Sequence, residues 1–321
     1  MSARKKTSSA KGKPKTPKAK KPVSKPIAKG VSPFGNGFWF KNWIPGAIIL
    51  ILPLLLYFQS TSFGYVLDDK IVLSENNFVK AGTAGISDIF GQESFTGFLG
   101  EQQNLVAGAR YRPLSLATFA LEWQWFEEAP GISHFINILL YALTGLLLFR
   151  LFFIIAPNKG AQPWYFTLPF LGALIFVLHP IHTEVVANIK GRDEILALLL
   201  SLGTLYFMLR YFVQNKIIYL PLAAITFLLA IFAKENSLTF LAVIPLLVML
   251  FMRIPLQKIV LACLPILGAA IVYILIRYSV IGFLLDSGTE VTSIMNDPFL
   301  EATAGQKYAT ITYTFGWYLK L

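Results

Sequence analysis

A succession of long apolar segments, separated by short polar turns, most constrains the fold of this chain. A helix must place about 20 apolar residues in the ~30 Å hydrocarbon core of a membrane, because each residue rises ~1.5 Å. The 321 residues are 55% hydrophobic and only 14% charged, whereas roughly a quarter of a soluble domain is charged. The sequence therefore excludes a single soluble core and predicts an all-α polytopic membrane protein.

We expect a bundle of about seven to eight transmembrane helices. The expected spans are residues 43–58, 134–155, 164–178, 195–213, 217–233, 238–252 and 259–276, with a further segment at 307–321. Fifteen residues at ~1.5 Å each cannot cross a ~30 Å core. This last segment is therefore predicted to be the start of a span in a longer protein.

Residues 60–133 form a long polar stretch that is too rich in Gly, Gln, Glu and Asn to span a membrane. Within it, residues 113–126 are apolar and begin with Pro113, a residue that suits the first turn of a helix. Fourteen residues are too few for a span, so we expect a half-buried helix at the membrane surface. The stretch as a whole is predicted to be a long first outer loop.

The basic character of the chain belongs to its N-terminal tail. Residues 1–41 hold twelve Lys or Arg and no Asp or Glu. We expect this tail to be disordered, because it has too few apolar residues to fold. Its charge predicts a cytoplasmic N-terminus, and attraction to anionic lipid is the alternative role. Nucleic-acid binding is not expected, since no folded reader accompanies the tail. The predicted division is a tail at 1–41 and a membrane domain at 42–321.

Charges alternate between the two sides of the membrane when the spans are counted from a cytoplasmic N-terminus. The inner turns carry only cations, namely Arg150, Lys159, Arg210, Lys216, Arg253 and Lys258. The outer side receives the carboxylates, including Asp286 and Glu290 in the last loop, and all three histidines. This one-sided distribution predicts that the functional groups meet at the outer face.

Five polar clusters fall on that outer face, at residues 67–70, 110–113, 179–184, 191–194 and 234–236. They supply the candidate site residues Asp68, Asp69, Arg110, Arg112, His179, His182, Glu184, Arg192, Asp193, Glu194, Lys234 and Glu235. Each cluster alone has an ordinary structural interpretation, because Asp favours turns and caps and acidic residues favour the first turn of a helix. A metal site is not expected, since Pro180 interrupts the spacing of the two histidines.

Taken together, the clusters combine carboxylates with Arg and Lys above a bundle of apolar helices. A carboxylate can take a proton from an acceptor hydroxyl, and cations, especially the forked donors of Arg, stabilise a phosphate leaving group. Competing interpretations are a transporter, a lipid-handling protein or an assembly scaffold. A transporter would place charges at mid-membrane depth or show inverted repeats, and neither is apparent in the sequence.

The clusters also occur in a familiar order: Tyr65-Val66-Leu67-Asp68-Asp69, Tyr111-Arg112-Pro113-Leu114, Leu178-His179-Pro180-Ile181-His182-Thr183-Glu184, Gly191-Arg192-Asp193-Glu194 and Ala233-Lys234-Glu235. This set resembles the GT-C superfamily of polyprenyl-phosphate-dependent glycosyltransferases, and most closely the protein O-mannosyltransferases and the TMTC-like membrane proteins with tetratricopeptide tails. The resemblance implies transfer of a sugar, expected to be mannose, from a polyprenyl phosphate to a protein or other hydroxyl acceptor on the outer face.

The resemblance also implies roles for single residues. Asp68 is the expected base, and Asp69 is expected to orient the acceptor or the sugar. This chain has Asp-Asp where the mannosyltransferases usually have Asp-Glu, so which carboxylate is the base stays open. The phosphate is expected at Arg110, Arg112, Arg192 and Lys234, and the sugar at His179, His182 and Glu184.

The implied partners are membrane lipid, the lipid-linked sugar and an acceptor protein or glycan. The donor is the only expected cofactor-like molecule, and dependence on a divalent metal ion stays open. The resemblance places the protein in a cell (inner) membrane, or in the endoplasmic reticulum membrane if its source is eukaryotic.

Overall fold

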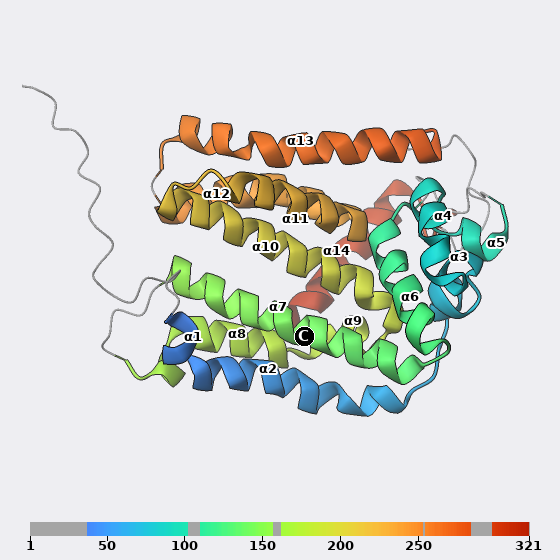
Figure 1. Ribbon diagram of the computed structural model, residues 1–321, viewed down its shortest axis with the longest axis horizontal. Helices are drawn as coiled ribbons and strands as arrows, with labels where there is room; N and C mark the ends of the chain where they lie inside the picture. The colour runs from blue at the N-terminus through green and yellow to red at the C-terminus, as the bar shows by residue number, and fades with distance from the viewer. Residues whose placement is uncertain (1–36, 102–109, 157–161, 253, 284–296, 321) are drawn as a thin grey trace, which may run out of the picture.

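The computed structural model describes residues 37–101, 110–156, 162–252, 254–283 and 297–320. These residues form helices joined by turns and contain no β-strand, which confirms the all-α prediction. Long helices run alongside one another, and short helices gather at one end of the bundle (Figure 1). Most of the basic tail (1–36), Lys159, Arg253, Asp286 and Glu290 lie outside the described residues.

Within the described residues, seven helices form the bundle, and they lie in the same general direction (Figure 1). They are α2 (Trp43–Tyr57), α7 (Pro130–Ile155), α8 (Leu168–Leu178), α10 (Arg192–Gln214), α11 (Tyr219–Ala233), α12 (Phe240–Met252) and α13 (Leu256–Ile281). Each follows an apolar run of the sequence. A short helix, α1 (Phe38–Lys41), precedes α2, and α9 (Thr183–Ala187) follows α8.

Fewer helices are long and apolar enough to cross a membrane than the seven to eight predicted. Within the described residues there are five, at Trp43–Ser62, Pro130–Ile155, Ile189–Gln214, Glu235–Met252 and Leu256–Ile281. A sixth span exists if α8 and the segment Pro180–Ala187, which meet at 47°, are counted together. Helix α11 is shorter, with 15 residues, but packs against its neighbours in the bundle.

The predicted third span needs correction. The third was expected to begin at residue 164, but α8 begins at Leu168, because Trp164–Phe166 forms a separate 3-10 turn and Pro169 lies in the first turn of the helix. The segment expected at 307–321 is α14 (Ala304–Lys320), which has 17 residues and buries none of them. It is too short to count as a span.

Two apolar cores hold the bundle together. One joins α10, α11, α12 and α13 through residues such as Met208, Phe227 and Ile266. The other joins α2, α7 and α8 through residues such as Ile49 and Phe149. Small residues permit close contact within membranes. A Cβ atom at Gly145 of α7 would lie 2.5 Å from Val177 and 3.2 Å from Ile49, so a glycine there lets the three helices meet.

The predicted outer loop folds into a cap of short helices over one end of the bundle (Figure 1). The cap contains α3 (Asn77–Lys80), α4 (Ile86–Gly91), α5 (Thr96–Leu99) and α6 (Pro113–Phe126). Helix α6 has the predicted bounds and starts at Pro113. It buries one face, including Leu116, Phe119 and Ala120, against Leu73, Val79 and Ile89 of the cap. The cap is thus a packed unit with its own core.

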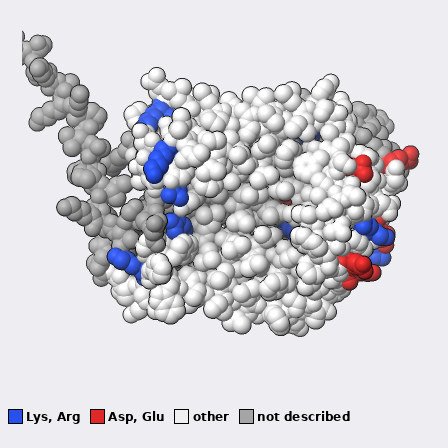
Figure 2. Space-filling model, in the orientation of Figure 1, with Lys and Arg blue, Asp and Glu red and all other residues white. Residues whose placement is uncertain are grey.

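The two ends of the bundle differ in charge (Figure 2). The end near α1 carries Lys and Arg, while the cap end carries both signs. Among the described residues, the helix ends near α1 hold the cations Lys41, Arg150, Arg210, Lys216 and Lys258 and no acidic residue. The predicted alternation of charge between the two ends is therefore present, and the fold places the mixed clusters beneath the cap.

Candidate functional site

A strained turn presents the two adjacent carboxylates. Leu67 has a φ of 45°, a conformation that costs a non-glycine residue of this kind roughly 1–3 kcal/mol and persists only where its surroundings enforce it. Asp69 enforces it from one side, because its Oδ2 accepts a hydrogen bond from the Val66 N–H at 3.0 Å. Strain of this kind is common at functional sites.

Asp68 and Asp69 are in different environments. The Asp69 residue is fully buried, and its Oδ1 accepts a second hydrogen bond from the Lys190 N–H at 2.9 Å. The Asp68 side chain is 51% exposed, and its Oδ2 lies 2.6 Å from Lys190 Nζ. Asp69 therefore fastens the turn to the start of α10, while Asp68 offers a carboxylate that water and a substrate can reach.

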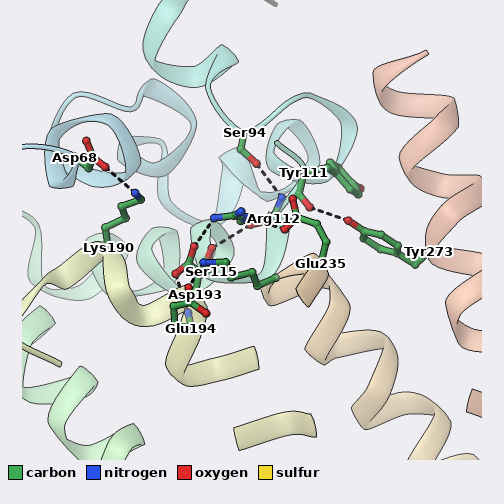
Figure 3. Close-up of polar contacts among 11 residues, drawn as sticks. Asp68, Ser94, Tyr111, Arg112, Ser115, Lys190, Asp193, Glu194, Glu235 and Tyr273 are labelled. Carbon is green, nitrogen blue, oxygen red and sulfur yellow. Dashed lines mark hydrogen bonds and ion pairs between the residues drawn. The ribbon is translucent and has the colours of Figure 1, made fainter. Parts of the chain in front are cut away.

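Arg112 forms the centre of a second cluster, shown in Figure 3. Its Nη1 lies 2.8 Å from Asp193 Oδ2, and its Nε lies 2.9 Å from Glu235 Oε2. Asp193 stands in the first turn of α10 and Glu235 begins the turn before α12. Burial lowers the pKa of Arg112, but the charges of Glu235 and Asp193 outweigh burial and raise it above its ordinary value. The guanidinium thus stays charged and draws three elements together.

The cap holds Arg110 and Arg112 through hydrogen bonds to the segment at residues 93–95. The Glu93 carboxylate accepts from the N–H groups of Phe95 at 2.8 Å and Arg110 at 3.1 Å. Ser94 Oγ accepts from the Arg112 N–H at 2.9 Å. The Arg110 guanidinium lies over the Phe95 ring, 5.1 Å from its centroid. Both arginines are therefore positioned by backbone contacts.

Tyr111 lies between these two arginines and anchors the segment 110–112 to the bundle. It is fully buried, and its hydroxyl donates to the Phe90 carbonyl at 2.7 Å. The Tyr273 hydroxyl of α13 donates in turn to the Tyr111 carbonyl at 3.3 Å (Figure 3). Burial raises the pKa of Tyr111 to about 12, so its hydroxyl serves as a neutral donor.

A small cavity of about 30 Å³ lies where these clusters meet. Its lining residues include the cations Arg110, Arg112 and Lys190, together with Asp193 and the hydroxyl residues Ser94 and Ser115. A space of this size holds a water molecule or two. With three cations and one carboxylate, the lining carries a net positive charge, which favours an anion. Nearby, Lys234 of the turn after α11 pairs with Glu194 of α10.

Arg192, predicted as a phosphate ligand, lies inside the protein. It is fully buried, with Nη1 2.8 Å from Glu122 Oε2, Nε donating to Asn137 Oδ1 at 2.8 Å and Nη2 donating to the Ser133 carbonyl at 3.0 Å. The guanidinium also lies over the Phe119 ring. These contacts join α6, α7 and α10, so we leave Arg192 out of the phosphate-binding set.

The side chains of the predicted sugar-pocket residues make other contacts than this network. His179 Nδ1 accepts from the Ile181 N–H at 3.2 Å, which caps the turn after α8. The His182 ring packs against Phe176 and Tyr141, with centroids 4.5 and 5.5 Å away. Glu184 lies in the first turn of α9. Within the described part of the chain, no three His, Cys, Asp or Glu side chains are grouped closely enough to hold a metal ion.

The structure thus brings together four of the five predicted clusters and adds Lys190, which sequence reasoning missed. Lys190 directly precedes the predicted cluster at 191–194, and a lone Lys beside a span gave no signal of its own. The only signal in the sequence was Gly191, the residue that follows Lys190, because a glycine can mark a tightly packed turn. A Cβ atom at Gly191 would lie 2.1 Å from the Val185 carbonyl oxygen, so a glycine is required where this turn packs tightly.

Comparison with known proteins finds relatives among the protein O-mannosyl-transferases. The chain is 27% identical to human protein O-mannosyl-transferase TMTC3 over 186 residues, which are 57% of this chain and 19% of that protein. It is 34% identical to human protein O-mannosyl-transferase TMTC1 over 149 residues, or 46% and 16%. Over these regions the chain is similar to the TMTC proteins. Their relationship confirms the predicted resemblance over about half of the chain.

A worm relative extends the comparison. The Caenorhabditis elegans protein O-mannosyl-transferase F38B6.6 is 29% identical over 160 residues, which are 49% of this chain and 22% of that protein. The matched region spans about a fifth of the length of these curated relatives. No protein-family model and no solved structure matches the chain.

Proposed function

We propose that this protein is an integral-membrane glycosyltransferase that moves a sugar from a polyprenyl phosphate to a hydroxyl acceptor at the cap end of the bundle. The observation that carries the proposal is a half-exposed carboxylate, Asp68, joined through Lys190 to a cavity lined by Arg110 and Arg112. The names of the TMTC relatives support mannose as the sugar and a protein as the acceptor.

The proposed reaction is a single displacement with inversion. The acceptor hydroxyl oxygen attacks the anomeric carbon of the sugar, and its proton passes to a carboxylate oxygen of Asp68. The bond from the anomeric carbon to the phosphate oxygen breaks, and its electron pair leaves with the polyprenyl phosphate. Arg110, Arg112 and Lys190 stabilise that anion, since charge-assisted hydrogen bonds to phosphate are strong. Lys234 and Glu194 border this set.

The reaction also requires a place for the polyprenyl tail of the donor. Exposed apolar side chains cover the outside of the bundle, for example Leu55, Ile175 and Leu275, so a polyprenyl tail can lie in lipid beside the helices while its phosphate reaches the cap end. We place this end on the outer or lumenal side, opposite the cationic end. The membrane is a bacterial inner membrane or an endoplasmic reticulum membrane.

The test is a transfer assay on the protein in proteoliposomes, with radiolabelled polyprenyl-phosphate mannose and a peptide that contains Ser and Thr. Transfer is expected for the wild type, and Asp68→Asn is expected to lose about 100-fold or more of it, which is the usual contribution of a general base. Absence of transfer by the wild type, or full activity in Asp68→Asn, would overturn the proposal.

A further inference from the structure

Lys190 is fixed at its backbone and mobile at its tip. Its N–H donates to Asp69 Oδ1 at 2.9 Å and to Asn188 Oδ1 at 3.1 Å. Gly191, the next residue, sits too close to the Val185 carbonyl for any side chain. Lysine carries its charge on a flexible four-carbon stem. The ammonium group can therefore move while its point of attachment stays in place.

The side chain of Lys190 faces two groups at once. Its Nζ contacts the Asp68 carboxylate at 2.6 Å (Figure 3). The residue also lines the cavity with Arg110 and Arg112. Lys190 therefore lies between the candidate base and the candidate phosphate site, within reach of either.

Two of the three cations that line the cavity, Arg112 and Lys190, are held to different degrees. The Arg112 guanidinium is paired with two carboxylates, and the side chain is 17% exposed. Lys190 has one carboxylate partner at its tip, and that partner is 51% exposed. Water screens an ion pair of this kind, so exchanging the partner costs little. A bound phosphate can therefore draw Lys190 away from Asp68 more readily than it can draw Arg112 away from its two carboxylates.

We propose that Lys190 is a positioning residue that exchanges partners when the donor binds. The phosphate of the lipid-linked sugar takes Lys190 Nζ from Asp68, and the freed Asp68 carboxylate then accepts the proton of the acceptor hydroxyl. In the empty site the same carboxylate is occupied by the ammonium group. The exchange rests on the proposed function and adds an order to it, in which the donor binds before the acceptor hydroxyl is activated.

Binding of the sugar-free lipid, polyprenyl monophosphate, to the purified protein tests the exchange without any transfer step. Lys190→Met removes one charge-assisted contact and is expected to weaken binding about tenfold. Asp68→Asn removes the competitor for Lys190 and is expected to tighten binding severalfold, although it abolishes transfer. A purely structural role of either residue would not produce these opposite changes. Lys190→Arg is expected to keep most of the binding.

A matched control lies in the same loop. Lys70 and Glu75 form an exposed pair, with 3.5 Å between Lys70 Nζ and Glu75 Oε1, and neither lines the cavity. Lys70→Met and Glu75→Gln are expected to bind the lipid like the wild type. Inorganic phosphate and a sugar nucleotide serve as competitors. Displacement only by the lipid identifies a lipid-linked phosphate, and displacement by either soluble anion at equal concentration would overturn that assignment.

Kinetics separate the exchange from the proposed function. In Lys190→Met the donor KM is expected to rise about tenfold, and kcat is expected to fall as well, because Lys190 also stabilises the departing phosphate. If the wild type transfers sugar but Asp68→Asn binds the lipid no more tightly, the exchange is wrong while the function stands. If the wild type neither binds the lipid nor transfers sugar, the function itself fails. Asp68 is half exposed, so its variant tests the exchange even if Lys190→Met does not fold.

Discussion

At the scale of single residues, Asp68 and Asp69 differ in what surrounds their carboxylates. Asp69 accepts hydrogen bonds from the Val66 and Lys190 N–H groups, so Asp69→Asn is expected to cost about 1–3 kcal/mol in the free energy of unfolding. Asp68→Asn is expected to leave stability within about 0.5 kcal/mol while it removes transfer. Thermal unfolding in detergent, measured beside the transfer assay, distinguishes the two. Equal loss of stability in both variants would contradict this division of roles.

Glu93 provides a pH-dependent prediction at the same scale. Burial raises the pKa of its carboxyl, although N–H groups of Phe95 and Arg110 donate to it. A carboxyl whose pKa is higher in the folded state binds its proton more tightly there, so stability increases as the pH falls through that pKa. As the pH falls toward the ordinary pKa of Glu, ~4.3, the wild type is expected to gain stability relative to Glu93→Gln.

The measurement is the difference in melting temperature between the two proteins at each pH, which cancels the titration of other groups. The exposed Glu75→Gln variant is the control, and its difference from the wild type is expected to stay flat. If the difference in melting temperature between the wild type and Glu93→Gln stays constant with pH, or changes in the opposite direction, the burial of Glu93 has no such effect.

The acidic pair was identified from the sequence, but which carboxylate is buried and which is exposed could not be predicted. What separates them is a contact between Asp69 and the backbone of Lys190, 121 residues further along the chain. The type and spacing of residues carry no record of such a contact. The same limit explains Arg192. It shares a motif with Asp193, yet its side chain is buried, because it meets Glu122 and Asn137 from distant helices.

At the scale of elements, the pair of Arg192 and Glu122 connects α10 to α6, with Asn137 and Ser133 joining from α7. Removing one member of a buried ion pair leaves a charge without compensation and costs about 3–5 kcal/mol. Arg192→Met is therefore expected to lower the free energy of unfolding by about that amount. The double variant Arg192→Met/Glu122→Leu is expected to recover a large part of it, since both charges are then absent.

Unfolding of the single and double variants in detergent, followed by tryptophan fluorescence, forms the measurement. Lys70→Met, which loses an exposed ion pair, is the control and is expected to unfold like the wild type. A double variant that loses the sum of both single effects would show that the pair has no coupling and that Arg192 acts through other contacts.

Helix positions were the best predicted elements because apolar runs determine them. The bounds of α6 follow from Pro113 and the apolar stretch after it. The start of α8 was wrong by four residues, since aromatic residues 164–166 look apolar but form a separate turn. The packing of the cap was not predictable, because its core joins α3, α4 and α6 through contacts between segments far apart in sequence.

At the scale of the whole molecule, the separation of charge between the two ends predicts how the protein sits in the membrane. The end near α1 carries cations alone among the described residues, and such ends face the cytoplasm. Sequence counting reached this alternation without the structure, because each span reverses direction and its flanking charges are visible in the sequence. The fold adds that the mixed cluster and the cap lie at one shared end.

This orientation can be measured with single cysteines. The native Cys263 is replaced by Ala, and then Ile217→Cys marks the turn between α10 and α11 while Ser87→Cys marks α4 of the cap. Both marker positions are exposed and lie outside the site. An α-helix of 26 residues, such as α13, is about 39 Å long, so its ends can reach opposite faces of a ~30 Å core.

In sealed vesicles of known orientation, a membrane-impermeant maleimide is expected to label Ile217→Cys only when the cytoplasmic face is outward. Ser87→Cys is expected to react only in the reverse orientation or after permeabilisation, and Cys263→Ala alone is the unlabelled control. If both markers reacted from the same side, the cap could not face an outer acceptor. The proposed reaction would then have to take place on the cytoplasmic side, where the tail enters the bundle, and the assignment of the acceptor to the outer face would be wrong.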